Sequence, residues 1–289
     1  MVNSRESRYL DVIFVIICIF VIFVCLLPML TLMARSLSSA EHLIRNEVTL
    51  WPKGFSFDAY RYVLSDSKYT WSLLWTAILT VSGTFLSLFM TTLAAYPLVY
   101  DKLKGRKFFS TVMLFTMYFN AGTIPMYLLL KDVGLLNKPL VLIVPYCLSV
   151  FNMILMRNYF YTIPESLRES AEIDGAGPFK ILTSIYLPLS TPVIATLALF
   201  YAVGRWNGFS DALMFMNKRE FFPIQLLLYN LINAVSSLET YSTEGFTPPG
   251  LSEALKAAAI MFATIPILFV YPWLQRYFIQ GVTLGAIKE

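Results

Sequence analysis

The sequence predicts an all-α integral membrane protein with six transmembrane helices, and two observations lead to this fold class. The chain has 289 residues, of which 57% are hydrophobic and only 14% are charged, and its mean hydropathy is +0.64. It therefore carries more apolar surface than a soluble domain buries. The apolar residues also fall into separate blocks of about 20, the length at which a helix crosses a hydrocarbon core of about 30 Å.

The first block could instead be the core of a signal peptide, because Arg5 and Arg8 precede it. A signal core has only about 7 to 15 apolar residues, and this block is longer, which favours a membrane span. No internal repeat or glycine-serine linker divides the chain, so we expect residues 1–289 to form one transmembrane domain. The six expected spans lie near residues 12–33, 70–100, 108–130, 139–159, 188–208 and 254–274.

The short segment 101–107 decides the expected orientation. Four of its seven residues are lysine or arginine, and such short basic loops stay on the cytoplasmic side. An even number of spans places both termini on that side as well. We therefore expect cytoplasmic termini, with the polar segments 34–69 and 209–253 on the outer face of a bacterial plasma membrane.

Composition excludes several other classes of protein. A formal charge of +4 without a long basic run argues against nucleic-acid binding. The three cysteines indicate no disulfide framework, and the single histidine, His42, cannot form a metal site alone. We find no nucleophile-base pair typical of a membrane-embedded enzyme, so neither a metal site nor a catalytic residue is expected.

The segment 162–187, between the fourth and fifth blocks, is too polar for the membrane and has the pattern of two short helices. Thr162 and Glu165 have the spacing of a capping box, and Pro164 suits a first helical turn. Ile163, Leu167 and Ala171 recur every four residues and predict one apolar face.

Glycine and proline predict how this first helix ends and the second begins. Gly175 and Gly177 can terminate a helix, and Pro178 can open another. The local pattern by itself is equally typical of a well-capped interfacial loop. Alternatively, the small residues around Asp174 would let the backbone of another protein approach closely, which predicts a docking surface.

The same segment resembles the EAA loop of binding-protein-dependent ABC importer permeases. The matching order is Glu169-Ser170-Ala171, three residues, Gly175, nine residues, Ile185, one residue, then Leu187-Pro188. Ser170 replaces the middle alanine of the triplet. The resemblance implies the type I ABC importer permease fold, with a cytoplasmic coupling helix-turn-helix at residues 162–187. It also implies that an ATPase subunit contacts Glu169, Ser170, Ala171, Asp174, Gly175 and Ala176.

Further motifs along the chain resemble the carbohydrate-uptake branch, in particular the smaller permease subunit of maltose-type and complex-oligosaccharide systems. They lie at residues 51–60, 157–160, 206–207 and 281–286. The resemblance implies five kinds of partner: a second related permease, two ATPase subunits, an extracytoplasmic solute-binding protein, an oligosaccharide substrate and the lipid bilayer. ATP and Mg²⁺ would bind to the ATPase subunits, because this chain contains no P-loop.

The substrate path is less clearly marked by the sequence. Sugars favour hydrogen-bonding side chains and aromatic faces, and such residues lie in or near several spans, although aromatic residues also populate helix interfaces. The candidates are Tyr118, Asn120, Tyr127, Phe151 and Asn152. Two other functions stay open: an ABC permease for a different class of solute, and an ion-coupled secondary transporter. The latter normally needs ionisable groups near the middle of a span, and we find none there.

Overall fold

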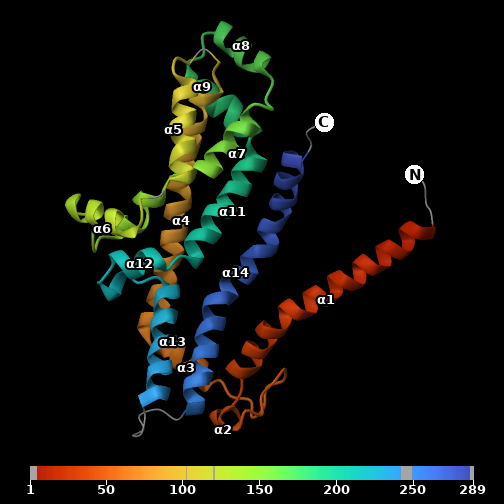
Figure 1. Cartoon of the computed structure of the whole chain (residues 1–289), viewed down its shortest axis with the longest axis vertical. Helices are drawn as coiled ribbons and strands as arrows, with labels where there is room; N and C mark the ends of the chain where they lie inside the picture. Colours follow the sequence, from red (N-terminus) through yellow and green to blue (C-terminus); the bar gives the residue numbers. More distant parts are fainter. Residues whose placement is uncertain (1–4, 102, 120, 242–248, 287–289) are drawn as a thin grey trace. The chain divides into compact units, whose positions relative to one another are not determined.

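The computed structural model describes residues 5–101, 103–119, 121–241 and 249–286, and these residues are mostly helical (Figure 1). They form two compact units, one of Met1–Thr70 with Leu227–Pro266 and one of Trp71–Leu226 with Ile267–Glu289. The first unit contains α1 (Arg5–Ser36), α2 (Ala40–Ile44) and α3 (Asp58–Ser65). The second contains α5 (Arg106–Tyr118), α6 (Thr123–Asp132), α7 (Val150–Phe160), α8 (Glu165–Ile173), α9 (Pro178–Ile181), α10 (Leu187–Leu189), α11 (Thr191–Asn207) and α12 (Ser210–Phe215). Three helices pass from one unit into the other: α4 (Ser67–Ala95), α13 (Ile224–Tyr241) and α14 (Pro249–Ala286).

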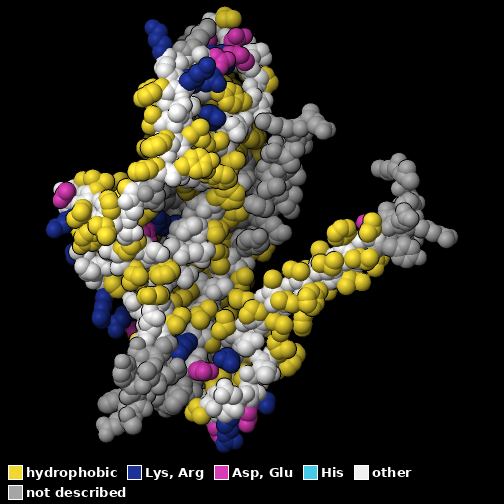
Figure 2. All heavy atoms as spheres, viewed as in Figure 1, with side chains coloured by type: hydrophobic (Ala, Val, Ile, Leu, Met, Phe, Trp, Pro, Cys, Tyr) yellow, Lys and Arg dark blue, Asp and Glu magenta, His cyan; other side chains and the backbone are white. Residues whose placement is uncertain are grey.

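Helix α1 of the first unit is apolar on every side. None of the residues in its most hydrophobic stretch is buried in the chain, and Figure 2 shows hydrophobic side chains along the part of the helix that it colours by type. The end of α1 is attached to α3, because the Ser36 hydroxyl lies 2.9 Å from the Tyr60 hydroxyl. In the loop between them, Ser38 forms an isolated β-bridge with Phe55. A helix that is hydrophobic all round and long enough to cross a bilayer needs lipid or another membrane helix around it.

The described residues contain three helices that are long and apolar enough to span a membrane. They lie at Leu10–Ser36, Ser67–Val99 and Ser252–Val270. Three further apolar stretches are bent helix pairs, and the count rises to six if each pair is one span. The pairs are Arg106–Tyr118 with Thr123–Asp132, Pro139–Tyr146 with Val150–Phe160, and Pro178–Leu189 with Thr191–Asn207, bent by 115°, 49° and 83°.

The bends lie where the backbone cannot continue a regular helix. Gly122, which precedes α6, has a φ of +92°. Ser149 is the N-cap of α7 and accepts a hydrogen bond from the Asn152 amide. Pro192 lies in the first turn of α11, and because proline has no N–H, it is well tolerated at a helix start. The predicted blocks 108–130, 139–159 and 188–208 each fall on one of these bent pairs.

The segment 209–253, which the sequence predicts only as polar, contains α12, α13 and the start of α14 in the part that the structure describes. The buried Ile224 amide at the start of α13 donates a hydrogen bond of 2.8 Å to the Thr76 hydroxyl of α4. Thr76 in turn donates to the Ser72 carbonyl at 2.7 Å. A search for blocks of about 20 apolar residues passes over such helices, because their hydrophobic side chains are interspersed with polar ones.

Two hydrophobic clusters hold the second unit together. One surrounds Phe160 and Tyr186, with Met153, Met156 and Leu197 beside them. The other consists of Leu79, Leu130, Val141, Leu142, Ala212, Phe215, Met216 and Leu226. The first cluster lies where α7 ends and the segment of α8 and α9 begins, so that segment packs against it.

Candidate functional site

Helix α8 and the turn after it form an exposed projection of the second unit (Figure 1). The turn has the Schellman geometry: the Gly175 amide donates to the Glu172 carbonyl at 3.1 Å, and the Ala176 amide donates to the Ala171 carbonyl at 2.9 Å. Gly175 has a φ of +79°, a conformation that side-chain-bearing residues rarely adopt. A second helix, α9, begins at Pro178 as the sequence predicted.

The predicted capping box at Thr162 is wrong. Helix α8 begins at Glu165 with Pro164 as its N-cap, and no side chain caps it. The Thr162 hydroxyl instead donates to the Tyr159 carbonyl at 2.7 Å, while Glu165 accepts from Arg168. Each side chain therefore has a different partner, one at the end of α7 and one within α8.

Arg168 is the residue of α8 that is buried against the rest of the unit. Its side chain is 10% exposed and pairs with Glu165 and with Glu172, the latter at 2.8 Å. Its guanidinium lies 4.9 Å from the centre of the Tyr100 ring. Burial by itself lowers the pKa of Arg168, but the hydrogen bonds to the two carboxylates outweigh it, so the pKa is raised and the charge persists at all physiological pH values.

An aromatic cluster fixes the start of α9 to the end of α4. The Tyr96 hydroxyl donates to the Pro178 carbonyl at 3.0 Å and lies 2.5 Å from the Tyr100 hydroxyl. The Tyr96 ring centre lies 5.1 Å from that of Tyr186 and 6.3 Å from that of Phe160, both edge to face. Tyr100 thus contacts both Tyr96 and Arg168. Helices α8 and α9 are therefore held by the same aromatic cluster, which we call the aromatic support.

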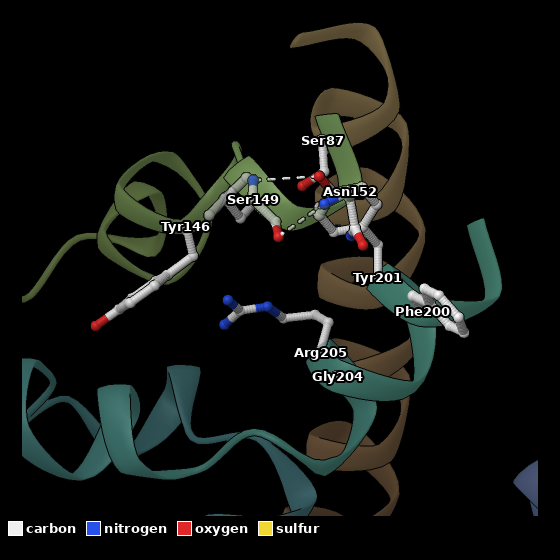
Figure 3. Close-up of a pocket in the computed structure, with 10 residues that line it drawn as sticks. Ser87, Tyr146, Ser149, Asn152, Phe200, Tyr201, Gly204 and Arg205 are labelled. Carbon is white, nitrogen blue, oxygen red and sulfur yellow. Dashed lines mark hydrogen bonds between the residues drawn. The ribbon is translucent and has the colours of Figure 1, made fainter. Parts of the chain in front are cut away.

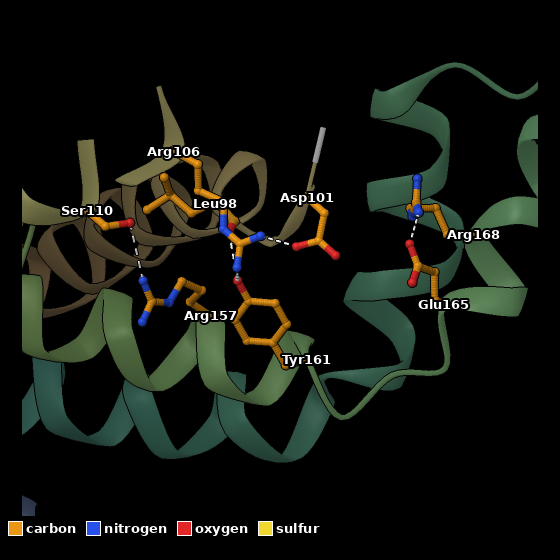
Figure 4. A network of polar contacts seen from close by, with 8 residues as sticks. All are labelled: Leu98, Asp101, Arg106, Ser110, Arg157, Tyr161, Glu165 and Arg168. Atoms are coloured by element: carbon orange, nitrogen blue, oxygen red, sulfur yellow. Dashed lines mark hydrogen bonds and ion pairs between the residues drawn. The ribbon is translucent and has the colours of Figure 1, made fainter. Parts of the chain in front are cut away.

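Figure 4 shows a polar network that joins α5 and the end of α7 to the residues just after α4. Arg106, from the basic segment 101–107, binds Asp101 and the Tyr161 hydroxyl. Tyr161 donates to the Leu98 carbonyl at 2.9 Å, and Arg157 donates to Ser110 at 3.4 Å. The basic segment that sets the expected orientation is therefore in direct contact with the residue before the 162–187 segment.

A cavity of about 280 Å³ lies within the second unit, where α4, α7 and α11 approach one another. One wall is held by hydrogen bonds. The Ser149 amide donates to the Tyr201 hydroxyl at 3.2 Å (Figure 3). That hydroxyl also lies 2.6 Å from the Thr91 hydroxyl. The residues that line the cavity are Gly83, Ser87, Ile143, Tyr146, Ser149, Asn152, Phe200, Tyr201, Gly204 and Arg205. Hydroxyl, amide and aromatic groups together are the surface that a sugar needs.

Arg205 is the charged residue in the cavity wall. Its guanidinium lies 2.5 Å from the Asp211 carboxylate, and the two side chains are 17% and 11% exposed. It also lies 5.6 Å from the centre of the Tyr146 ring. Figure 3 shows the side chain reaching into the cavity toward Tyr146.

The structure places most of the predicted docking residues on the surface. Glu169, Ser170, Asp174 and Gly175 are exposed, whereas Ala171 and Ala176 are partly buried and pack against the first hydrophobic cluster. The predicted apolar face of α8 is only partly correct, because Leu167 is exposed while Arg168 is buried.

The predicted substrate-path residues do not come together. Asn152 is 6% exposed and lines the cavity. Tyr118 is 82% exposed, Phe151 is also exposed, and Tyr127 stacks on Phe215. Asn120 lies outside the described residues.

Sequence reasoning missed several residues of the cavity wall and of the aromatic support. Ser87 and Gly83 belong to a row of small and polar residues that recurs every three or four positions along α4, a signal that was present in the sequence. Arg205 lies close to the end of its predicted block, where a basic residue is ordinary. Tyr96, Tyr146 and Tyr201 carry no local signal, because tyrosine populates membrane helices and their interfaces whether or not it lines a cavity.

Comparison with known proteins agrees with these features. The model of the family described as binding-protein-dependent transport system inner membrane component matches residues 83–284. The polygalacturonan/rhamnogalacturonan transport system permease protein YtcP of Bacillus subtilis (strain 168) is 40% identical over 266 residues, covering 92% of this chain and 93% of YtcP.

Two solved structures have the same fold. A chain from the crystal structure of a bacterial ABC transporter that imports the acidic polysaccharide alginate aligns with a TM-score of 0.85 at 33% identity, covering 96% of this chain and 99% of that one. A chain from a bacterial alginate ABC transporter bound to a periplasmic protein carrying alginate pentasaccharide aligns with a TM-score of 0.59 at 19% identity, covering 93% of each.

The predicted all-α membrane fold and the predicted family are thus confirmed. A family match over most of the chain, a relative that is 40% identical over 92% of it and a shared fold all support this assignment. This chain therefore belongs to the binding-protein-dependent transport system inner membrane components, the multi-pass permease subunits of ABC importers.

Proposed function

We propose that this permease takes up oligosaccharides by alternating access, driven by a separate ATPase that docks on α8 and the turn after it. The proposal rests on the structure of this projection, in which an exposed tip is joined to a buried attachment. Its tip, around Asp174 and Gly175, is exposed and small, while Arg168 and the start of α9 are fixed to the membrane helices. A rigid projection of this kind transmits a push at its tip to the helices that support it.

The proposed mechanism divides the work between subunits. Two ATPase subunits bind ATP and Mg²⁺, and their closure moves α8 and, through Tyr96 and Tyr100, the end of α4. Closure biases the permease toward its outward-open state, and hydrolysis releases it inward. The chain itself makes no covalent bond with its substrate.

The proposed partners follow from the family and its relatives. A second, related permease completes the membrane path, and an extracytoplasmic binding protein delivers the sugar. Both termini and the 162–187 segment face the cytoplasm, on the side of the basic segment 101–107. The cavity that Asn152 lines supplies part of the route, and the names of the relatives support an oligosaccharide as the cargo.

The proposal is tested by purifying the permease together with its candidate partners. The permease pair should co-purify with an ATPase, and in proteoliposomes loaded binding protein should raise ATP hydrolysis and drive uptake of labelled oligosaccharide. Uptake by the permease without any ATPase, driven by an ion gradient, would establish a secondary transporter instead. A cysteine at Ser170 that reacts with an impermeant reagent from outside the cell would contradict the proposed orientation.

Tyr96 provides a specific test of the aromatic support. The change Tyr96→Phe keeps the ring and removes both hydroxyl contacts, so we expect a loss of about 1 kcal/mol in stability. We also expect fewer sugars imported per ATP hydrolysed, because α9 is less firmly joined to α4. The measurements are thermal unfolding in detergent and the ratio of uptake to ATPase activity.

The control is Tyr60→Phe, which likewise keeps the ring and removes a hydroxyl contact, in this case the one to Ser36, but lies far from α9 in the sequence. It should show a similar loss of stability with an unchanged ratio. If both variants lowered the ratio equally, Tyr96 would have no special part in coupling.

A further inference from the structure

The charge of the cavity wall points to a substrate property beyond the proposed oligosaccharide class. Among the described residues that line the cavity, Arg205 alone carries a formal charge. Asp211, its ion-pair partner, does not line the cavity and also accepts a hydrogen bond of 3.0 Å from the Ala212 amide. Of this ion pair, the Arg205 guanidinium therefore lines the cavity, whereas the Asp211 carboxylate lies outside the lining.

Arg205 retains the capacity to bind a second anion. A guanidinium has five N–H donors, and within the described part of the chain the hydrogen bond of Arg205 is the one from Nη1 to Asp211. Arg168 of the same chain shows how one guanidinium binds two carboxylates at once, because it donates from Nη1 to Glu172 and from Nη2 to Glu165. Arg205 has one carboxylate in place, and its guanidinium is in contact with the open cavity.

The guanidinium is also held in position. The Tyr146 ring faces it from one side. On α4, Gly83 lies next to the arginine stem, because a Cβ at that position would be in ordinary van der Waals contact with Cγ of Arg205, at 3.7 Å. A cation that is fixed before the ligand arrives loses little entropy when it binds.

The neutral part of the wall suits a sugar ring. Ser87 and the 6%-exposed Asn152 line the cavity beside Arg205 and carry hydroxyl and amide groups. Phe200 and Tyr146 add aromatic surface. A volume of about 280 Å³ is at the lower end of ligand sites and accommodates a single sugar residue of a longer chain.

We propose that this cavity is a subsite for one uronic-acid residue of the transported oligosaccharide, with Arg205 binding its carboxylate. The inference rests on the proposed function, because the subsite acts only if an oligosaccharide passes this point. A carboxylate in contact with a partly buried guanidinium forms an ion pair that can be bidentate, whereas a neutral hydroxymethyl group at the same position accepts at most a single, weaker hydrogen bond.

The test compares two substrate pools that differ in one group. Oligogalacturonates and oligomannuronates are each offered to the complete transporter in proteoliposomes, beside the same pools after reduction of their carboxylates to hydroxymethyl groups. Uptake is measured for the wild type, Arg205→Gln and Asp211→Asn, with Arg45→Gln as a control that removes an exposed arginine paired with Glu41. The binding protein is the same throughout, so its own selectivity cancels in the ratio of variant to wild type.

We expect Arg205→Gln to lower the ratio of acidic to reduced-pool uptake roughly tenfold or more. Asp211→Asn should keep or raise that ratio, because it frees the guanidinium, and Arg45→Gln should leave it unchanged. Equal loss of both pools in Arg205→Gln and Asp211→Asn would mean that the pair is structural, and the subsite would be refuted. Wild-type uptake that is ATP-driven but confined to neutral sugars would refute it too, whereas absence of any ATP-driven uptake would refute the proposed function itself.

Discussion

Replacing Gly175 by tryptophan should abolish ATP-driven uptake while the permease still inserts into the membrane. A Cβ at Gly175 would meet no atom of the chain within 4 Å, so the new side chain begins in open space. It would extend from the exposed tip into the space that a docked ATPase needs. We expect uptake to fall to the background level and ATP hydrolysis to lose its response to loaded binding protein.

Backbone strain is the competing cause, because Gly175 has a φ of +79°. A side-chain-bearing residue in this conformation costs about 1 to 2 kcal/mol, and asparagine tolerates it best. Gly175→Asn therefore has similar backbone demands with far less bulk, and it should retain most of the uptake. Asp174→Lys tests the same contact without the strained position, by reversing a charge at the C-cap of α8.

Co-purification of the ATPase with each variant completes this test. Loss of both uptake and ATPase binding in Gly175→Trp would identify the tip as part of the docking surface. Wild-type uptake and assembly in both Gly175→Trp and Asp174→Lys would show that the ATPase docks elsewhere, and the proposed coupling mechanism would then fail.

Arg168→Met should separate α8 from its aromatic support. The change removes the cation that lies over Tyr100 and leaves Glu165 and Glu172 without their partner. Breaking a buried ion pair costs about 3 to 5 kcal/mol, but these carboxylates are largely open to water, so we expect roughly 1 to 3 kcal/mol. Hydrogen exchange should accelerate in α8, and uptake should fall several-fold because motion of the tip no longer reaches α4.

Two further variants make the interpretation specific. Arg168→Lys keeps the charge but lacks the planar fork that serves two carboxylates at once, so it should give an intermediate loss of uptake. Arg45→Met removes an exposed i,i+4 pair with Glu41 and should change stability by less than about 0.5 kcal/mol. Unchanged exchange in α8 of Arg168→Met would show that the other contacts of the segment suffice to hold it.

Part of the candidate site could be predicted from the sequence, because the features concerned depend on single residues and their immediate neighbours. Gly175 and Pro178 mark a turn and a helix start by their own conformational limits, and the structure has both features there. Thr162 was misinterpreted because its hydroxyl had two possible backbone partners, and only the folded chain shows that it binds the Tyr159 carbonyl. Asn152 was recognised as polar within a span, but its neighbours in the cavity come from α4 and α11 and could not be assigned from spacing.

The sequence by itself determined that this protein is a helical membrane protein of the ABC permease family, since apolar block length and the motif at 162–187 depend only on residues close together in the chain. Tertiary structure alone decided where the spans bend, that Arg168 rather than Leu167 packs inward, and that Ser87, Asn152 and Arg205 share one cavity. The physical reason is how far apart in the sequence the interacting residues lie. Helix formation and membrane insertion follow from local periodicity and hydrophobicity. Burial and pairing depend on side chains from segments that lie far apart in the chain, as Tyr100 and Arg168 or Ser87 and Arg205 do.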